Sequence, residues 1–187
     1  MSRHVLSCAA SHDAPGQPIS LVRVQVEAEG DPRYWLYVEA RAEATLQQLD
    51  ALLRRVWLEC CGHMSAFRTG QREPAMRSKI GVALGDKGQV FLYEYDFGST
   101  TALRGRVLGT RQGSLGRTAV RLLARNDPLP WSCEECTQPA SVVCPFCSES
   151  SPCVLCDEHA EQHPCAEEDV YLPVVNSPRM GVCGYGA

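Results

Sequence analysis

The chain has 187 residues, a formal net charge of −4, and 44% hydrophobic against 21% charged residues. This is the composition of a globular protein with one domain and an appendage, or with two small domains. The first twenty residues hold no apolar run of signal-peptide length, and no stretch reaches the roughly 18 apolar residues of a membrane helix. We therefore expect a soluble, cytoplasmic protein with no membrane partner. The eleven cysteines are an odd number, which argues against a disulfide framework in a reducing compartment.

The first segments read as a lead-in followed by a hairpin. Residues 1–18 are expected to be flexible, and their APGQP segment is typical of a turn or loop. Residues 19–28, ISLVRVQVEA, alternate apolar and polar side chains and predict a half-buried strand. After a GDP turn, residues 33–40, RYWLYVEA, predict a second strand that pairs with the first.

The next segments predict one helix and three more strands. Residues 44–61 carry leucines at helical spacing, with Thr45 as a plausible N-cap and a glycine after the last turn. Strands are expected over 89–99, 100–112 and 116–126, although the arginines of the last would also suit a helix. This order implies an α+β fold, with one main helix on a mostly antiparallel sheet, followed by a small zinc-stapled cysteine-rich module.

The charge changes sign between the two parts of the chain. Residues 132–187 contain nine acidic residues and the single basic residue Arg179, whereas residues 1–131 have a net charge of +4. We therefore expect an α+β domain over about 19–128, a zinc-binding module over 131–169 and a C-terminal strapping tail over 170–187.

The module concentrates side chains that bind metals. Its spacing is C-x2-C-x7-C-x2-C-x5-C-x2-C-x2-H-x3-H-x-C. A Cys-x-x-Cys turn places two sulfurs at the separation that one tetrahedral Zn²⁺ needs, and a remote pair completes the shell. The candidate ligands are Cys133, Cys136, Cys144, Cys147, Cys153, Cys156, His159, His163 and Cys165.

Other uses of these cysteines fit less well. A thioredoxin-like site has one Cys-x-x-Cys in a βαβ context, not three in succession. An iron–sulfur cluster would use four cysteines and leave the histidines unexplained. A segment this short and this poor in apolar residues cannot fold by burial alone, so the metal must supply folding energy. We expect two structural zinc ions.

The module resembles the B-box zinc domains of tripartite-motif proteins in the order of its paired ligands, CEEC…CPFC…CVLC…HPC. The resemblance implies a cross-brace, in which the first and third pairs share one ion and the second pair shares the other with the last ligands. The first site would then be Cys133, Cys136, Cys153 and Cys156. The second would be Cys144, Cys147, His163 and Cys165, with His159 competing for one place.

A second resemblance covers most of residues 19–185. YEYDFGS (93–99), with TLQQLDALLRRVW before it and LLARN after it, is similar to the plasmid pRiA4b ORF-3-like family. The closing LPVVNSPRMGVCGY is similar to a zinc-bearing bacterial subgroup of that family. Where the family has GW…H…F, this chain reads CCGHMSAF (60–67). The resemblance implies an α+β fold and a link to plasmids and mobile elements, but no established activity.

Three functional hypotheses follow. The leading one is a non-enzymatic interaction or adaptor protein of the bacterial cytosol, with a protein partner and structural zinc. The second is a nucleic-acid-associated protein that contacts phosphates through arginines; the candidates are Arg104, Arg106, Arg117, Arg121 and Arg125. The third is a metal-dependent phosphodiester hydrolase using Glu94 and Asp96, although a carboxylate before Phe-Gly more often supports a turn.

Three further cysteines lie outside the module's ligand pattern. Cys60 and Cys61 end the predicted helix, where the helix dipole opposes thiolate formation, so we expect buried, unreactive thiols there. Cys183 in the tail is a possible zinc ligand but exceeds the number that two sites require.

Overall fold

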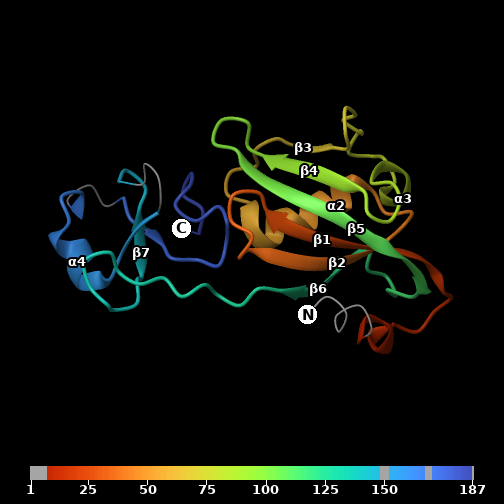
Figure 1. The fold of residues 1–187 in the computed structure, drawn as a ribbon, viewed down its shortest axis with the longest axis horizontal. Coiled ribbons are helices and arrows are strands. Elements are labelled where there is room, and N and C mark those ends of the chain that lie inside the picture. The colour runs from red at the N-terminus through yellow and green to blue at the C-terminus, as the bar shows by residue number, and fades with distance from the viewer. Residues whose placement is uncertain (1–7, 148–151, 167–169, 187) are drawn as a thin grey trace. The chain divides into compact units, whose positions relative to one another are not determined.

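The structure is a computed structural model that describes residues 8–147, 152–166 and 170–186 (Figure 1). Parts of the predicted lead-in, module and tail therefore lie outside the described residues, namely 1–7, 148–151, 167–169 and 187.

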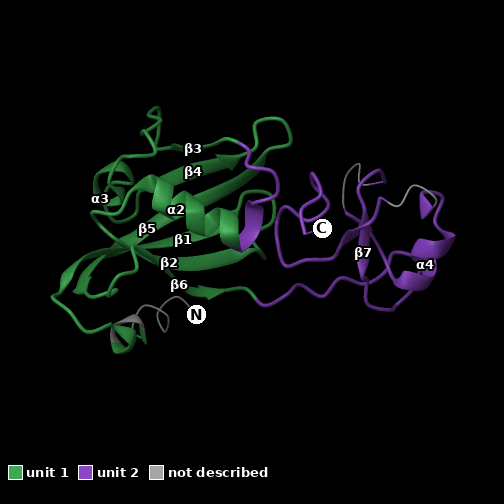
Figure 2. Ribbon diagram, turned by 180° about the vertical axis from the view of Figure 1, so that it is seen from behind, with its two compact units in different colours: residues 1–55, 64–126 green, residues 56–63, 127–187 purple. Residues whose placement is uncertain are grey.

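The chain forms two compact units (Figure 2). Unit 1 contains residues 1–55 and 64–126, and unit 2 contains residues 56–63 and 127–187. Sequence reasoning assigned residues 56–63 to the first domain, whereas in the structure they belong with the C-terminal part. Each unit is described below by itself.

Unit 1 is built on a six-stranded antiparallel sheet in the order β3-β4-β5-β1-β2-β6. Its strands are β1 (Ile19–Ala28), β2 (Trp35–Arg41), β3 (Ser65–Arg68), β4 (Val90–Tyr95), β5 (Thr101–Gly113) and β6 (Val120–Arg125). The short connections β1–β2 and β4–β5 are hairpins, as expected for antiparallel neighbours.

The alternation in β1 determines the two faces of this sheet. Val22, Val24 and Val26 are buried on one face, while Arg23 and Gln25 between them are only half-buried on the other. Successive side chains of a strand point to opposite faces, so the apolar set collects under the helix and the polar set forms a charged face.

Helix α2 (Leu46–Leu53) covers the apolar face of the sheet (Figure 1). Thr45 is its N-cap, and the Thr45 N–H donates to Oε1 of Gln48 at 3.0 Å, which satisfies one orphan donor at the helix start. The helix continues as a π-helical turn, η2 (Arg54–Leu58). The remaining short helices before residue 127 are η1 (Ala9–His12) and α3 (Ile80–Ala83).

One glycine in β5 makes room for an aromatic ring in the core. Gly105 lies opposite Phe91 of β4, whose side chain is 1% exposed. A Cβ added at Gly105 would lie 1.9 Å from Cζ of Phe91. The ring therefore occupies the space that any other residue at position 105 would need.

We expect Gly105→Ala to destabilise unit 1 by about 1–3 kcal/mol, because overpacking forces the Phe91 ring or the backbone to move. Urea unfolding followed by far-UV circular dichroism measures the change. Gly30→Ala is the matched control, since a Cβ there meets nothing within 4 Å. Adding Phe91→Leu to Gly105→Ala should recover part of the loss. Equal midpoints for the two glycine variants would contradict this account.

Unit 2 contains a small antiparallel sheet in the order β8-β7-β9. These strands are β7 (Val142–Cys144), β8 (Cys153–Leu155) and β9 (Leu172–Pro173), and helix α4 (Asp157–Gln162) follows β8. One of its two buried clusters consists of Cys133, Cys144, Cys153, Leu155, Cys156 and Ala160. Four of these six residues are cysteines, so apolar burial alone is a weak source of stability here.

The predicted fold class, α+β with a mostly antiparallel sheet and a cysteine-rich C-terminal region, is confirmed. The structure adds β3 and α3, which carry too little periodicity to predict. Residues 13 and 14, which the sequence placed in a flexible lead-in, contact the sheet: the Ala14 N–H donates to the Ser114 carbonyl at 3.0 Å. Among the described residues, no helix is both long and apolar enough to cross a membrane.

Candidate metal centres

The first Cys/His cluster brings together Cys133, Cys136, Cys156 and His159, whose ligand atoms all lie within 4.8 Å of one another. The Cys136 and Cys156 sulfurs are 3.8 Å apart, and Nδ1 of His159 lies 3.6 Å from the sulfur of Cys133. A tetrahedral zinc with Zn–S bonds of about 2.3 Å implies sulfur–sulfur separations of about 3.8 Å. The cluster therefore has the dimensions of a tetrahedral site.

Backbone hydrogen bonds favour a thiolate at the start of this cluster. Burial acts to raise the pKa of the Cys133 thiol, but hydrogen bonds from the backbone of Cys156, Glu135 and Cys136 outweigh it and lower the pKa to about 6. Because a metal binds the thiolate and not the thiol, this turn is prepared for a cation.

The second cluster brings together Cys144, Cys147, His163 and Cys165, again with all ligand atoms within 4.8 Å. The Cys147 and Cys165 sulfurs are 3.8 Å apart. Burial and hydrogen bonding with Cys147 and Cys144 raise the pKa of Cys165 to about 11. Metal binding here would release protons, which makes affinity depend on pH.

The grouping differs from the predicted cross-brace at Cys153 and His159. Cys153 is the first residue of strand β8, and Cys156 lies directly after the strand. Side chains three residues apart in an extended segment point in opposite directions, so Cys153 and Cys156 diverge. Cys156 joins the first cluster with His159, which follows on the first turn of α4. The Cys153 sulfur instead lies 3.9 Å from Nε2 of His163, beside the second cluster.

The fourth place of the second cluster has two candidates. Nδ1 of His163 accepts a hydrogen bond from the Cys165 N–H at 3.2 Å, so a neutral His163 carries its proton on Nε2. For Nε2 to bind a metal, its proton must move to Nδ1, and Nδ1 can then no longer accept the hydrogen bond from the Cys165 N–H. Cys153 requires no such change of tautomer. His163 and His159 separate because His163 is the C-cap of α4 and has extended backbone angles.

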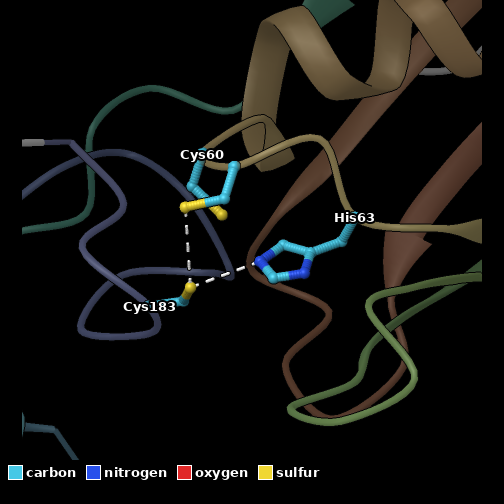
Figure 3. A group of neighbouring side chains, drawn as sticks. Cys60, His63 and Cys183 are labelled. Carbon is cyan, nitrogen blue, oxygen red and sulfur yellow. Dashed lines mark hydrogen bonds between the residues drawn. The ribbon is translucent and has the colours of Figure 1, made fainter.

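A third cluster brings together Cys60, Cys61, His63 and Cys183 (Figure 3). All four residues belong to unit 2. The Cys61 and Cys183 sulfurs are 3.9 Å apart, and Nε2 of His63 lies 3.3 Å from the sulfur of Cys183. Hydrogen bonding with Cys183 is the largest cause that raises the pKa of Cys61, to about 11.

Sequence reasoning treated Cys60 and Cys61 as buried thiols and Cys183 as surplus. In the structure Cys60 is partly exposed, and Cys61 and Cys183 are exposed. The available signal was the Cys-Cys-x-His string combined with one unassigned cysteine in the tail, but nothing in the sequence brings segments 120 residues apart together.

None of the eleven cysteines forms a disulfide in the structure. The sulfur–sulfur separations of 3.8–3.9 Å within the three clusters far exceed the roughly 2.05 Å of a disulfide bond. Each of the three Cys/His groups could thus hold a metal ion, and donor sets of thiolates with imidazole suit zinc.

The candidate hydrolase carboxylates have local partners. Glu94 forms an ion pair with Arg68 at 2.6 Å. Asp96 has a positive φ of 63°, and its Oδ1 accepts a hydrogen bond from the Gly98 N–H at 3.0 Å. Asp96 therefore supports the turn after β4. Within the described residues, neither carboxylate belongs to a group of three or more metal-ligating side chains.

The arginine candidates are partly neutralised by acids of unit 1. Arg104 pairs with Glu29 at 2.9 Å. Arg121 pairs at 2.8 Å with Glu39, a completely buried carboxylate on β2. Arg106 and Arg117 are exposed, and Arg125 is half-buried. Two of the five candidates, Arg104 and Arg121, therefore pair with acids of their own unit.

The Glu39 network extends to the N-terminal segment. Arg111, the sixth arginine of this region, donates to Glu39 at 2.6 Å and pairs with Asp13 at 2.7 Å. The hydrogen bond from Arg111 is the main cause that lowers the pKa of Asp13. Arg121 also donates to the His12 carbonyl at 2.6 Å. This network fixes the segment before β1 on the charged face of the sheet.

A second buried carboxylate, also missed from the sequence, lies on α2. Oδ1 of Asp50 accepts hydrogen bonds from the Tyr93 hydroxyl at 2.7 Å and from Ser65 at 2.6 Å, and Arg54 donates to Oδ2 at 2.8 Å. Burial, followed by the charge of Asp50, raises the pKa of Tyr93 far above its usual value. Asp50 is thus a satisfied core group. Its only sequence signal was an acid on the leucine face of the helix.

The chain matches no family model and no curated protein. Among solved structures it is similar to the crystal structure of a protein of unknown function, MM3350, from Methanosarcina mazei Go1, with a TM-score of 0.50 and 13% sequence identity. The similarity covers 59% of this chain and 70% of that chain. At this identity the likeness supports the fold alone.

Proposed function

We propose that the protein is a non-enzymatic interaction or adaptor protein whose C-terminal module is held by two structural zinc ions. The observation that carries this proposal is that each cluster of the module offers four ligand-type side chains whose ligand atoms lie within 4.8 Å of one another. A zinc ion with four protein ligands has no open position for water or substrate, which is the mark of a structural site.

The proposed ligands follow the structural grouping. The first ion is bound by Cys133, Cys136, Cys156 and His159. The second is bound by Cys144, Cys147 and Cys165, with His163 or Cys153 in the fourth place. The first set, with three thiolates and one neutral imidazole, has a formal charge of −1, which adds to the acidity of this part of the chain.

We propose a protein partner that contacts the second cluster. Phe146 lies between Cys144 and Cys147 and is 66% exposed. A metal-held turn would present this ring rigidly, and rigid aromatic side chains are over-represented among the residues that dominate protein interfaces. Acidic surroundings disfavour a nucleic acid at the same surface.

We propose the cellular compartment from the thiols and the family from the YEYDFGS motif. Eleven cysteines, none of them in a disulfide, fit a reducing compartment, so we propose the bacterial cytoplasm. Membership of the pRiA4b ORF-3-like family, and with it a link to plasmids and mobile elements, remains a proposal that rests on the motif.

The test is quantitative crosslinking in cells that express the tagged chain, followed by mass spectrometry. We expect protein crosslinks to the module in the parent chain and about a tenfold loss with Phe146→Ala, as for an interface residue worth about 1.4 kcal/mol. Val82→Ala is the matched control, because Val82 is 77% exposed but lies on α3 of unit 1. Its crosslinks should not change.

Two results would overturn the adaptor proposal. One is salt-dependent binding of DNA or RNA that is lost when Arg104 and Arg106 are both replaced by glutamine. The other is divalent-metal-dependent phosphodiester hydrolysis that Asp96→Asn abolishes while circular dichroism shows the fold intact. Crosslinks that are unaffected by Phe146→Ala would remove the proposed contact surface.

A further inference from the structure

We propose that Cys60, Cys61, His63 and Cys183 form a third zinc site, separate from the two sites of the module. Their four ligand atoms lie within 4.8 Å of one another. Figure 3 shows His63 and Cys183 facing each other next to Cys60. The sulfur–sulfur distance of 3.9 Å and the nitrogen–sulfur distance of 3.3 Å approximate the edges of a tetrahedron around zinc.

Contacts that do not involve the cysteines bring the two segments together. The Ser177 hydroxyl donates to the Trp57 carbonyl at 2.6 Å, and the Arg179 N–H donates to the Ser177 hydroxyl at 2.9 Å. All three residues are at most 1% exposed. The buried contact fixes residues 177–179 against the chain just before Cys60. Buried contacts outside the cluster therefore hold its two segments next to each other.

The backbone at the cluster is unusual in a way that supports a function. Cys183 has a φ of 52°, in the left-handed region that a residue with a Cβ rarely adopts. Gly62, with a φ of 73°, forms the turn between Cys61 and His63. Left-handed non-glycine residues are strained and persist where their surroundings compensate, commonly at ligand sites. A metal bond to Cys183 would supply that compensation.

The donor set identifies the class of ligand. Three thiolates and one imidazole suit zinc, a borderline-soft ion that takes four ligands without a redox change. A redox disulfide explains the cluster less well, because it would leave one cysteine and His63 without a role. With all four positions filled by the protein, the site is structural and not catalytic.

Exposure distinguishes this site from the other two. None of the four side chains of this site is buried, whereas Cys133 and Cys156 of the first module cluster and Cys144 of the second are buried. Chelators reach an exposed ion more easily, so the third zinc should be the first to leave. Its loss would detach the tail at Cys183 from residues 60–63 without opening the module.

The test is the zinc content of the full chain, purified under reducing conditions and measured by elemental analysis. We expect three zinc ions per chain, one for each cluster, and two in the Cys61→Ser, Cys183→Ser double variant. Cys8→Ser is the control, because Cys8 belongs to none of the three clusters, and it should retain three. Since both replaced side chains are exposed, the double variant should keep the circular dichroism spectrum of the parent.

Cobalt substitution provides a second readout. The thiolate-to-cobalt absorption of the parent should fall by about a third in the double variant, in proportion to the thiolates lost. Equal metal content in parent and double variant would overturn the third site. A parent with one ion and a double variant with none would instead support the third site and overturn the two zinc ions of the module. The two proposals therefore fail in distinguishable ways.

Discussion

Removing metal from the chain is expected to unfold the module while the sheet of unit 1 stays folded. Binding of structural zinc contributes roughly 10–16 kcal/mol in small zinc domains. The apolar core of the module is small: four of the six residues in one buried cluster are cysteines, and the other cluster has four buried residues, Val143, Val154, Leu172 and Met180. Unit 1 draws its stability from the apolar face of a six-stranded sheet and α2, and none of the three Cys/His clusters found among the described residues lies in it.

Hydrogen exchange followed by mass spectrometry resolves the two units. After treatment with a chelator and a reductant, peptides from β7, β8 and α4 should lose their protection, while peptides from β1 and β5 should keep it. Cys144→Ser should have the same effect without a chelator, because Cys144 is completely buried. Cys8→Ser should resemble the parent chain. Protected module peptides in metal-free protein would refute a stapling role for the metal.

The Glu39→Gln variant is expected to destabilise unit 1 by about 3 kcal/mol. The change leaves the partly buried guanidinium groups of Arg111 and Arg121, 13% and 22% exposed, without the charge that they share. Removing one partner of a buried ion pair costs on the order of 3–5 kcal/mol, and Asp13, which still pairs with Arg111, keeps the effect at the low end.

Urea unfolding monitored by hydrogen exchange of β1 and β2 peptides measures this loss. The matched control is Glu29→Gln, because Glu29 pairs with Arg104 on the surface, where the two side chains are 40% and 57% exposed. Such a pair contributes less than about 1 kcal/mol. Equal shifts of the unfolding midpoint for the two variants would show that the buried network is not a main support of the sheet.

Local patterns predicted the elements that are determined locally. Strand β1 has the bounds expected from its alternation, because one buried face enforces a period of two over ten residues. Thr45 caps α2 as its position before the leucine pattern indicated. The nine residues that the spacing of the module singled out include all eight that gather in its two Cys/His clusters.

Long-range arrangements could not be predicted in the same way. How the cysteines divide between the two module clusters depends on Cys153, which starts a strand and not a tight turn. The repeated Cys-x-x-Cys motif gives no sign of this difference. The contact between His63 and Cys183 joins residues 120 apart in the sequence. Likewise, the burial of Glu39 depends on arginines 72 and 82 residues away. Sequence periodicity carries no information about such pairs.

The composition of unit 2 has a consequence for synthesis of the chain. Residues 56–63 leave the ribosome long before residues 127–187, with which they fold. Until Ser177 and Cys183 emerge, Trp57 lacks the tail that contacts it, and Cys60, Cys61 and His63 lack the fourth member of their cluster. The nascent chain therefore passes through an interval with adjacent thiols open to oxidation. A fragment that ends at Asn126 would remain in that vulnerable state permanently.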